Sequence, residues 1–377
     1  MEEQEIKVKN ETYQCPKCGG NMAFDPQTQS LYCEYCGNRI SLTGEHSDVE
    51  NDFSQGIEND EKWDNEAIVF HCKNCGANNI RQKNDLTSVC PFCGSKSVIE
   101  SEELPGIKPQ RIIPFKIAKE YAFDAFQKKA KKSFFAPRDF KKNFNIDKFN
   151  GAYLPAWTFD TNVFASYKGR LGKYYTVTVG TGKNRHTETR IKWFNIEGTK
   201  QFSFDDLFVL AGNRLNEKQI KPILPFDTNN SFIYKQEYVS GFSAEHYDID
   251  LKDGWEIAKA NAMSQMKTMI ANSYNHDIVD YINIKPVYSD IKYKYVLVPT
   301  WIANYRYHNK NYYFIVNGEN GKTSSKTPIS ILKVFITILI IIAIFAVAAL
   351  IIIKTSDNNS DEYIDYMMIL RNYIRLK

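Results

Sequence analysis

Several common signatures of enzymes and secreted proteins are missing from this 377-residue sequence. The six histidines are scattered and contain no H-E-x-x-H pair, which excludes the usual zinc-peptidase motif. No loop has a Walker A spacing, because Val177 and Val316 stand where the first glycine would fall, so no nucleotide is expected. The first fourteen residues are charged and polar, unlike a secretory signal peptide. The net charge of +4 is ordinary for this length.

Cysteine is absent from most of the chain, but near the N-terminus eight cysteines form two copies of C-x2-C-x14-C-x2-C. Each pattern supplies four thiolates in two close pairs, which suits a tetrahedral zinc ion. Glycine follows the second cysteine of each C-x2-C pair. Because glycine has no side chain, the backbone there can turn so that its amides point towards the sulfur. The sequence therefore predicts two structural zinc ions. The ligands are Cys15, Cys18, Cys33 and Cys36 in one site, and Cys72, Cys75, Cys90 and Cys93 in the other.

Other uses of these cysteines are less compatible with the pattern. Disulfides are disfavoured because closely spaced cysteines rarely bridge each other and no signal peptide is present. Iron in a rubredoxin-like site uses similar turns and remains open. His71, beside Cys72, is expected to be a strand residue rather than a ligand.

One long apolar run occurs, at residues 334–353, with Thr337 as its one polar member. Twenty helical residues span about 30 Å, the thickness of a hydrocarbon core, so a single transmembrane helix is predicted. Flanking lysines give little orientation bias. Zinc–thiolate sites persist in reducing compartments, so we expect residues 1–333 in the cytosol. The tail, 354–377, is either an amphipathic surface helix or a polar end.

The composition divides the remaining chain into modules. Zinc ribbons are predicted at 12–43 and 67–100, joined by an acidic, flexible linker at 44–66. A second linker covers 101–110, where glycine and proline recur. Aromatic residues concentrate afterwards, which favours an α+β domain with an antiparallel sheet at 111–327.

Short motifs suggest that this domain is internally duplicated, with halves at 111–210 and 222–325. Ile113-Pro114-Phe115 resembles Leu224-Pro225-Phe226, and Leu154-Pro155-Ala156-Trp157 resembles Val298-Pro299-Thr300-Trp301. In each half a helix lies between the two motifs, at 118–132 and at about 254–273. Asp253 and Glu256 have capping-box spacing for the second helix. Strands with hairpin turns follow each Pro-x-Trp motif, around 180–182 and 308–311.

A basic segment at 111–150 interleaves lysines with phenylalanines. It predicts either contact with anionic lipids or binding along a nucleic-acid backbone, beside the simpler interpretation of a solvated helix. Membrane anchoring favours lipid over nucleic acid. The candidate contacts are Lys128, Lys129, Lys131 and Lys132.

No nucleophile–base arrangement is recognisable, so the sequence gives no positive indication of an enzyme. A pocket joining Asp160 to His186 or His246 would indicate one. A zinc held by four thiolates has no open position for substrate. The leading hypothesis is a membrane-anchored adaptor that recruits a protein partner at the cytosolic face. The first rival is a nucleic-acid-binding protein that uses the ribbons and the basic segment 111–150. The second is an enzyme with an unrecognised site in the α+β domain.

The order of these parts resembles the bacterial family of TFIIB-type zinc ribbon-containing proteins, some of which carry a primosomal-helicase label. The resemblance covers most of residues 12–325. It depends on the cysteine pairs and on Ile113-Pro114-Phe115-Lys116, Ala136-Pro137-Arg138-Asp139-Phe140, Gly151-Ala152-Tyr153-Leu154-Pro155-Ala156-Trp157, Gly241-Phe242-Ser243-Ala244-Glu245, Tyr247-Asp248-Ile249-Asp250, Val298-Pro299-Thr300-Trp301 and Asn317-Gly318-Glu319-Asn320-Gly321-Lys322. It implies zinc ribbons but no particular activity, and the missing phosphate loop contradicts the helicase label.

Overall fold

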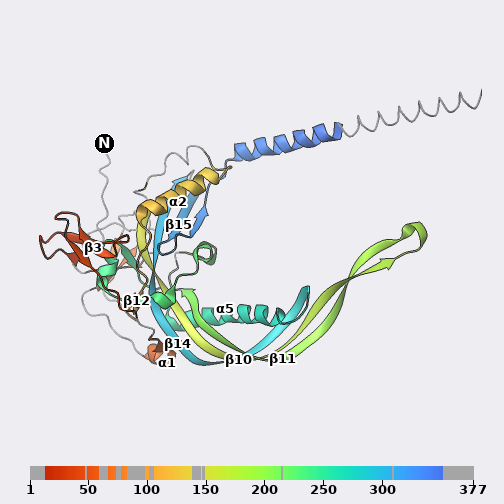
Figure 1. Cartoon of the computed structure of the whole chain (residues 1–377), viewed down its shortest axis with the longest axis horizontal. Helices are drawn as coiled ribbons and strands as arrows, with labels where there is room; N and C mark the ends of the chain where they lie inside the picture. The colour runs from red at the N-terminus through yellow and green to blue at the C-terminus, as the bar shows by residue number, and fades with distance from the viewer. Residues whose placement is uncertain are drawn as a thin grey trace, which may run out of the picture. The chain divides into compact units, whose positions relative to one another are not determined.

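The computed structural model describes residues 13–46, 49–58, 67–73, 78–82, 98–101, 106–137, 146, 149–213, 215–307 and 310–350. The chain forms two compact units, one of residues 1–126 and 145–326 and the other of residues 127–144 and 327–377 (Figure 1). The metal-ligand candidates and the sheets belong to the first unit, and the apolar helix belongs to the second.

The first cysteine set lies in a small antiparallel sheet. Its strands, in spatial order, are β1 (Tyr13–Gln14), β2 (Asn21–Asp25), β3 (Ser30–Cys33) and β4 (Arg39–Ser41). Met22, Phe24 and Leu31 are buried, and few other apolar side chains are. So small a core supplies little folding free energy by itself, and a metal bound to the four cysteines would supply much of the rest.

The main domain is an α+β structure whose long strands pair antiparallel, as predicted. Three long strands and two shorter ones run in the order β11 (His186–Leu210), β10 (Phe149–Val179), β14 (Ile278–Tyr307), β15 (Lys310–Asn317) and β16 (Thr323–Lys326), of which β15 and β16 are the shorter. Further short strands extend the sheet: β5 (Asn51–Asp52), β6 (Ala67–Cys72), β7 (Asn78–Gln82), β8 (Val98–Ser101), β9 (Arg111–Ile112), β12 (Phe232–Ile233) and β13 (Ser243–Glu245). Two of these, β9 and β13, pair parallel with β14 and β10 and make the whole sheet mixed.

The sheet bends where β10 meets irregularities in both neighbours. Pairing with β11 shifts between Phe159 and Thr161, and pairing with β14 shifts between Asp160 and Asn162. Asp206 on β11 and Asp290 on β14 have a positive φ of 52° at these shifts. Such bulges bend and twist a strand. The long strands accordingly curve around helix α5 (Figure 1).

Helix α5 (Leu251–Ala271) fills the concave side of this curve. It begins one turn before the predicted start, because the carboxylate of Asp250 accepts the amide of Asp253 and caps the helix. Its buried stripe includes Trp255, Ala258, Ala262, Met266 and Ile270. The other helical segments are α1 (Phe53–Glu58), α2 (Lys119–Lys132), α4 (Glu217–Ile220), η2 (Gly182–Asn184), η3 (Lys221–Ile223), η4 (Thr228–Asn230) and η5 (Gln236–Val239).

The two Pro-x-Trp motifs lie on neighbouring strands of one sheet. Leu154 pairs directly with its counterpart Val298, so the motifs run antiparallel about that pair. The indole of Trp157 donates to the Ile249 carbonyl, two residues before α5, at 2.9 Å. The indole of Trp301 donates to the Ile117 carbonyl, two residues before α2, at 2.8 Å. Trp157 thus holds the segment that leads into α5, and Trp301 holds the segment that leads into α2.

Backbone bonds at the strand ends follow the same scheme. Ala211, after β11, donates to the Pro155 carbonyl, and its own carbonyl accepts the amides of Asp248 and Ile249. Gly318, after β15, donates to the Pro299 carbonyl and accepts from Lys116 and Ile117 in the same way. Both halves therefore contribute to one continuous core.

The predicted flexible linker is partly ordered. Within it, β5 pairs with β14, and Phe53 of α1 packs on Phe159 and Trp255. The carbonyl of Val49 accepts the buried Arg111 guanidinium at 2.7 Å. The acidic composition did not predict this, because a few well-placed side chains outweigh the average polarity of the segment.

The second unit contains the end of α2 and the apolar helix Ile331–Leu350. This helix begins three residues before the predicted 334, because Ser330 precedes it and its hydroxyl accepts the amide of Lys333. Its side chains are exposed in this structure, and it is long and apolar enough to cross a membrane. Residues 351–377, including the predicted tail, lie outside the described residues.

Candidate metal centre and surrounding surfaces

The first four cysteines converge as predicted. Their sulfur atoms all lie within 4.8 Å of one another, with 3.6 Å between Cys15 and Cys36 and 3.5 Å between Cys18 and Cys33. Tetrahedral thiolates about 2.3 Å from zinc would be about 3.8 Å apart, so the set fits a metal ion of that size. The four side chains could therefore bind a metal.

Tight turns direct the sulfur atoms inward. Gly19 and Gly37 have positive φ values of 69° and 71°, and their amides donate to the carbonyls of Cys15 and Cys33. The amide of Gly20 donates to the Cys18 sulfur at 3.4 Å. A glycine after each second cysteine is thus required by the turn, as the motif predicted.

The thiols of this site differ in acidity. Although desolvation acts in the opposite direction, the backbone amides of Lys17 and Cys18 lower the pKa of Cys15 to about 6. The Gly20 amide acts to lower the pKa of Cys18, but the neighbouring sulfurs of Cys36 and Cys33 raise it to about 12. Four thiolates this close repel one another, and a bound cation would remove that repulsion.

The second cysteine set is described only at Cys72, which is buried at the end of β6. Cys75, Cys90 and Cys93 lie outside the described residues, so the second zinc site stays a prediction. His71 is a strand residue whose ring nitrogen lies 2.8 Å from the Asn78 side-chain oxygen.

The cysteine modules pack on the main domain. Phe24 of β2 contacts the rings of Tyr238 and Phe242, and its amide donates to the Ser240 carbonyl at 2.9 Å. Strand β7 pairs with β13 through Ala244 and Ile80. We expected modules on a flexible arm, but strand edges and aromatic side chains fix them to the sheet.

An ionic cluster of four carboxylates around the buried Lys294 lies at the bend of the sheet. Glu50, Asp160, Asp205 and Asp206 bring carboxylate oxygens within 4.8 Å of one another. The Lys294 ammonium lies 2.9 Å from Asp206 and 3.1 Å from Glu50, and its side chain is 6% exposed. Because the Lys294 ammonium already supplies a positive charge between the carboxylates, we interpret the arrangement as an ion-pair network rather than as a metal site.

The charges of this network perturb one another. Desolvation, followed by the hydrogen bond with Glu50, raises the pKa of Asp160 to about 6. Desolvation also raises the pKa of Asp205, beside Asp160. Burial acts to lower the pKa of Lys294, but pairing with Asp206 and Glu50 raises it overall. No local pattern predicts this cluster, because Glu50 belongs to the segment interpreted as a linker and is far in sequence from its partners.

The catalytic grouping considered from the sequence is not assembled. Asp160 lies at the bend, whereas His186 is exposed at the tip of the β10–β11 hairpin, opposite Val179. His246 follows β13, and its amide donates to the Asn78 carbonyl. Asp248 and Asp250 accept backbone amides, so their roles are structural.

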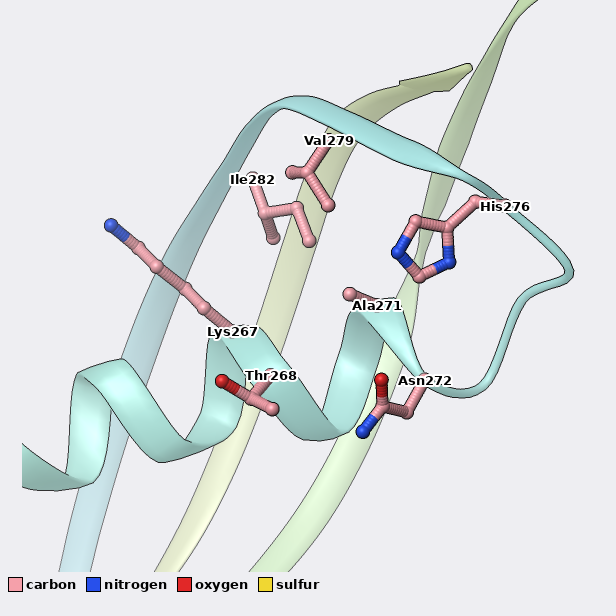
Figure 2. A pocket seen from close by; sticks show the side chains of 7 residues that line it. All are labelled: Lys267, Thr268, Ala271, Asn272, His276, Val279 and Ile282. Atoms are coloured by element: carbon pink, nitrogen blue, oxygen red, sulfur yellow. The ribbon is translucent and has the colours of Figure 1, made fainter. Parts of the chain in front are cut away.

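An open depression lies at the end of α5 (Figure 2). It is lined by Lys267, Thr268, Ala271, Asn272, His276, Val279 and Ile282. The ring of His276 is 3.0 Å from the Tyr274 carbonyl. The titratable side chains of the lining are His276 and Lys267, and Lys267 points away from the His276 ring (Figure 2). The lining has no carboxylate or thiol, so it offers no set of metal ligands.

A two-stranded arm extends beyond the three-stranded part of the sheet. Strand β14 begins at Ile278, opposite Gly172, so from Lys173 to Val179 strand β10 pairs with β11 alone. Residues 173–192 carry five lysines and arginines against Glu188. Tyr174 and Tyr175 are also exposed. The arm is therefore a basic, aromatic projection.

Comparisons with known proteins give one informative likeness. No family model and no solved structure match the chain. The chain is 28% identical over 323 residues to the uncharacterized protein YdjG of Bacillus subtilis (strain 168). That alignment covers 85% of this chain and 90% of YdjG, so the likeness extends over most of both proteins.

Proposed function

We propose that this chain is a membrane-anchored binding protein that recruits a macromolecular partner through its zinc-stabilised modules. The observation that supports the proposal most is the closed four-cysteine site packed on the sheet. Four sulfurs leave no open position for substrate, so the metal would have a structural role. The module then presents a rigid outer surface. The proposal includes membership of the zinc ribbon family described above, a second zinc ion in the other cysteine set, and a cytosolic location for residues 1–333.

The outer surface of the first module has a suitable contact residue. Tyr35 lies between the ligands Cys33 and Cys36 and is 71% exposed. Met22 and Phe24, on the same module, are buried. Exposed tyrosines on rigid turns are frequent anchors at protein interfaces. We therefore expect Tyr35 to contact the partner.

A crosslinking pull-down from membranes tests this role. The wild-type chain is compared with Tyr35→Ala and with a variant in which Cys15, Cys18, Cys33 and Cys36 are serine. Tyr121→Ala is the matched control, because Tyr121 is also exposed, at 52%, but lies on α2. Partner loss in the first two variants and retention in the control are expected. Equal recovery of the same proteins from all four samples contradicts recruitment by this module.

We further propose that the α+β domain arose by duplication. The equivalent bonds made by Trp157 and Trp301, and by Ala211 and Gly318, support this. In this proposal the long β10–β11 arm is an elaboration of one half, since β15 in the other half is short.

Nucleic-acid binding is the second candidate, and the two-stranded arm favours it. A β-ribbon fits the major groove of DNA, and basic side chains neutralise phosphates. The double variant Lys173→Gln, Lys192→Gln would then lose about two phosphate contacts. The slope of the logarithm of the DNA-binding constant against the logarithm of the salt concentration would become shallower by about two. No binding of the full chain to duplex or single-stranded probes at low salt excludes this candidate.

A further inference from the structure

We infer that the lysine-rich end of α2 and the turn after it bind anionic phospholipid headgroups where the apolar helix enters the bilayer. We call this surface, residues 128–136 together with Lys333, the basic turn. The inference rests on the membrane anchoring in the proposed function, and it is independent of any protein partner.

Hydrogen bonds hold the basic turn against the start of the apolar helix. The ammonium of Lys333, in the first turn of that helix, donates to the Phe134 carbonyl at 3.0 Å and to the Ala136 carbonyl at 2.6 Å. The amide of Ser330 donates to the Phe135 carbonyl at 2.8 Å. All of these residues belong to the second compact unit. If the helix crosses a bilayer, the basic turn is therefore held at the lipid–water interface.

The charge of this surface suits a layer of phosphates. Lys128, Lys129, Lys131 and Lys132 are exposed at the end of α2. With Lys333 they make five lysines, and the described residues of this unit, 127–137 and 327–350, include no carboxylate. Clusters of lysine beside a membrane span attract anionic lipids, because each charge near the surface lowers the energy of contact.

The two exposed phenylalanines of the basic turn favour anionic lipid over a nucleic acid as its ligand. Phe134 is 68% exposed and Phe135 is 39% exposed, and their rings meet edge to face with centroids 5.3 Å apart. Water solvates such a pair poorly, whereas the boundary between headgroups and acyl chains accommodates aromatic rings beside lysines. A nucleic-acid backbone would pair with the lysines through its phosphates. It would offer no apolar environment for the two phenylalanine rings, and it would not account for the attachment of the turn to an apolar helix.

A photocrosslinking experiment with the full-length chain tests the inference. Position 134 receives p-benzoylphenylalanine, which keeps the phenyl ring and adds a photoreactive benzoyl group, and the 68% exposure of Phe134 leaves room for this larger side chain. The chain is reconstituted in nanodiscs of phosphatidylcholine mixed with phosphatidylglycerol, and crosslinked lipids are identified by mass. We expect phosphatidylglycerol to exceed its share of the bilayer about fivefold or more, since one effective lysine contact corresponds to about that factor.

Matched variants identify the source of the enrichment. Changing Lys128, Lys129, Lys131 and Lys132 to glutamine should return the crosslinks to the bilayer composition. The control changes the exposed Lys168, Lys218, Lys252 and Lys285 to glutamine, which removes the same charge elsewhere and should leave the enrichment intact. Soluble glycerol phosphate should compete no better than chloride at equal ionic strength. Zinc content and circular dichroism verify that each variant is folded.

Several results would overturn the inference. Crosslinks that match the bulk lipid ratio in the wild-type chain would show no preference for anionic headgroups. Equal losses in the test and control variants would show a non-specific charge effect, and displacement by glycerol phosphate would show a general phosphate site. A chain that fails to remain in the nanodiscs would instead refute the membrane anchor of the proposed function.

Discussion

At the scale of single residues, Lys294 carries the most consequential charge of the main domain. It is buried at the bend of the sheet and pairs with Asp206 and with Glu50. Asp206 also accepts the hydroxyl of Thr228 at 2.7 Å. Removing one member of a buried pair leaves the others in an apolar environment without compensation. The network therefore ties segment 49–58 to β11 and β14.

We expect Lys294→Met to lower the free energy of unfolding by about 3–5 kcal/mol, because two buried carboxylates lose their ammonium. Urea denaturation of the full chain in mild detergent, followed by circular dichroism, measures the change. Lys292→Met is the control, since Lys292 is 55% exposed and lies 4.0 Å from Glu50. A loss no larger than that of the control would show that Lys294 does not support the bend.

Asp160→Asn should stabilise the chain at neutral pH. The pKa of Asp160 is raised from 3.8 to about 6, so its ionisation costs more in the folded than in the unfolded state. Its contribution to stability therefore falls as pH rises from about 4 through about 6 and remains lower above that. After allowance for solvent screening, we expect the variant to gain about 1 kcal/mol near pH 7.5 and almost nothing near pH 4. Denaturation curves at both pH values measure this, and an equal effect at the two refutes the assignment.

At the scale of elements, the approach to each long helix is fixed by a tryptophan from the other half of the domain. Trp157 is fully buried and Trp301 is 5% exposed. Gly254 of α5 lies directly against the Trp157 ring, where a larger side chain would collide. The helices are therefore positioned by strands that are remote in sequence.

Trp157→Phe and Trp301→Phe should destabilise the chain by similar amounts, about 2–3 kcal/mol each. Each substitution removes one buried hydrogen bond and part of a packed ring. Trp193→Phe is the control, because Trp193 is 39% exposed and should cost less than about 0.5 kcal/mol. Denaturant titrations compare the three, and a large cost at one motif with none at the other would contradict equivalent roles.

At the scale of the whole molecule, the first cysteine module and the main domain differ in what stabilises them. The module has a small core around a four-sulfur cluster, whereas β10, β11 and β14 are held by long ladders and buried aromatic rings. Loss of the metal should therefore act locally.

We expect chelation to unfold β1–β4 while the long strands remain folded. Amide hydrogen exchange should lose protection at Met22, Phe24 and Leu31, and protection at Leu154 and Val298 should change little. Peptide-level exchange with and without chelator, alongside metal analysis, provides the measurement. Retained protection in β2 and β3 after complete metal removal would show that docking on Tyr238 and Phe242 suffices for folding.

Features that depend on a few neighbouring residues could be predicted from the amino-acid sequence. Cysteine spacing predicted the cluster that the structure forms from Cys15, Cys18, Cys33 and Cys36, because each close pair of thiols is set by a few consecutive residues. Apolar length identified the helix at 331–350, and alternation with turn residues identified the hairpins. The packing of the cysteine modules on the sheet and the pairing of the two Pro-x-Trp strands could be seen only in the folded chain. The same holds for the contacts of Glu50 with Asp160, Asp206 and Lys294. These contacts join residues far apart in the chain, and their energies depend on shape and burial that no local pattern records.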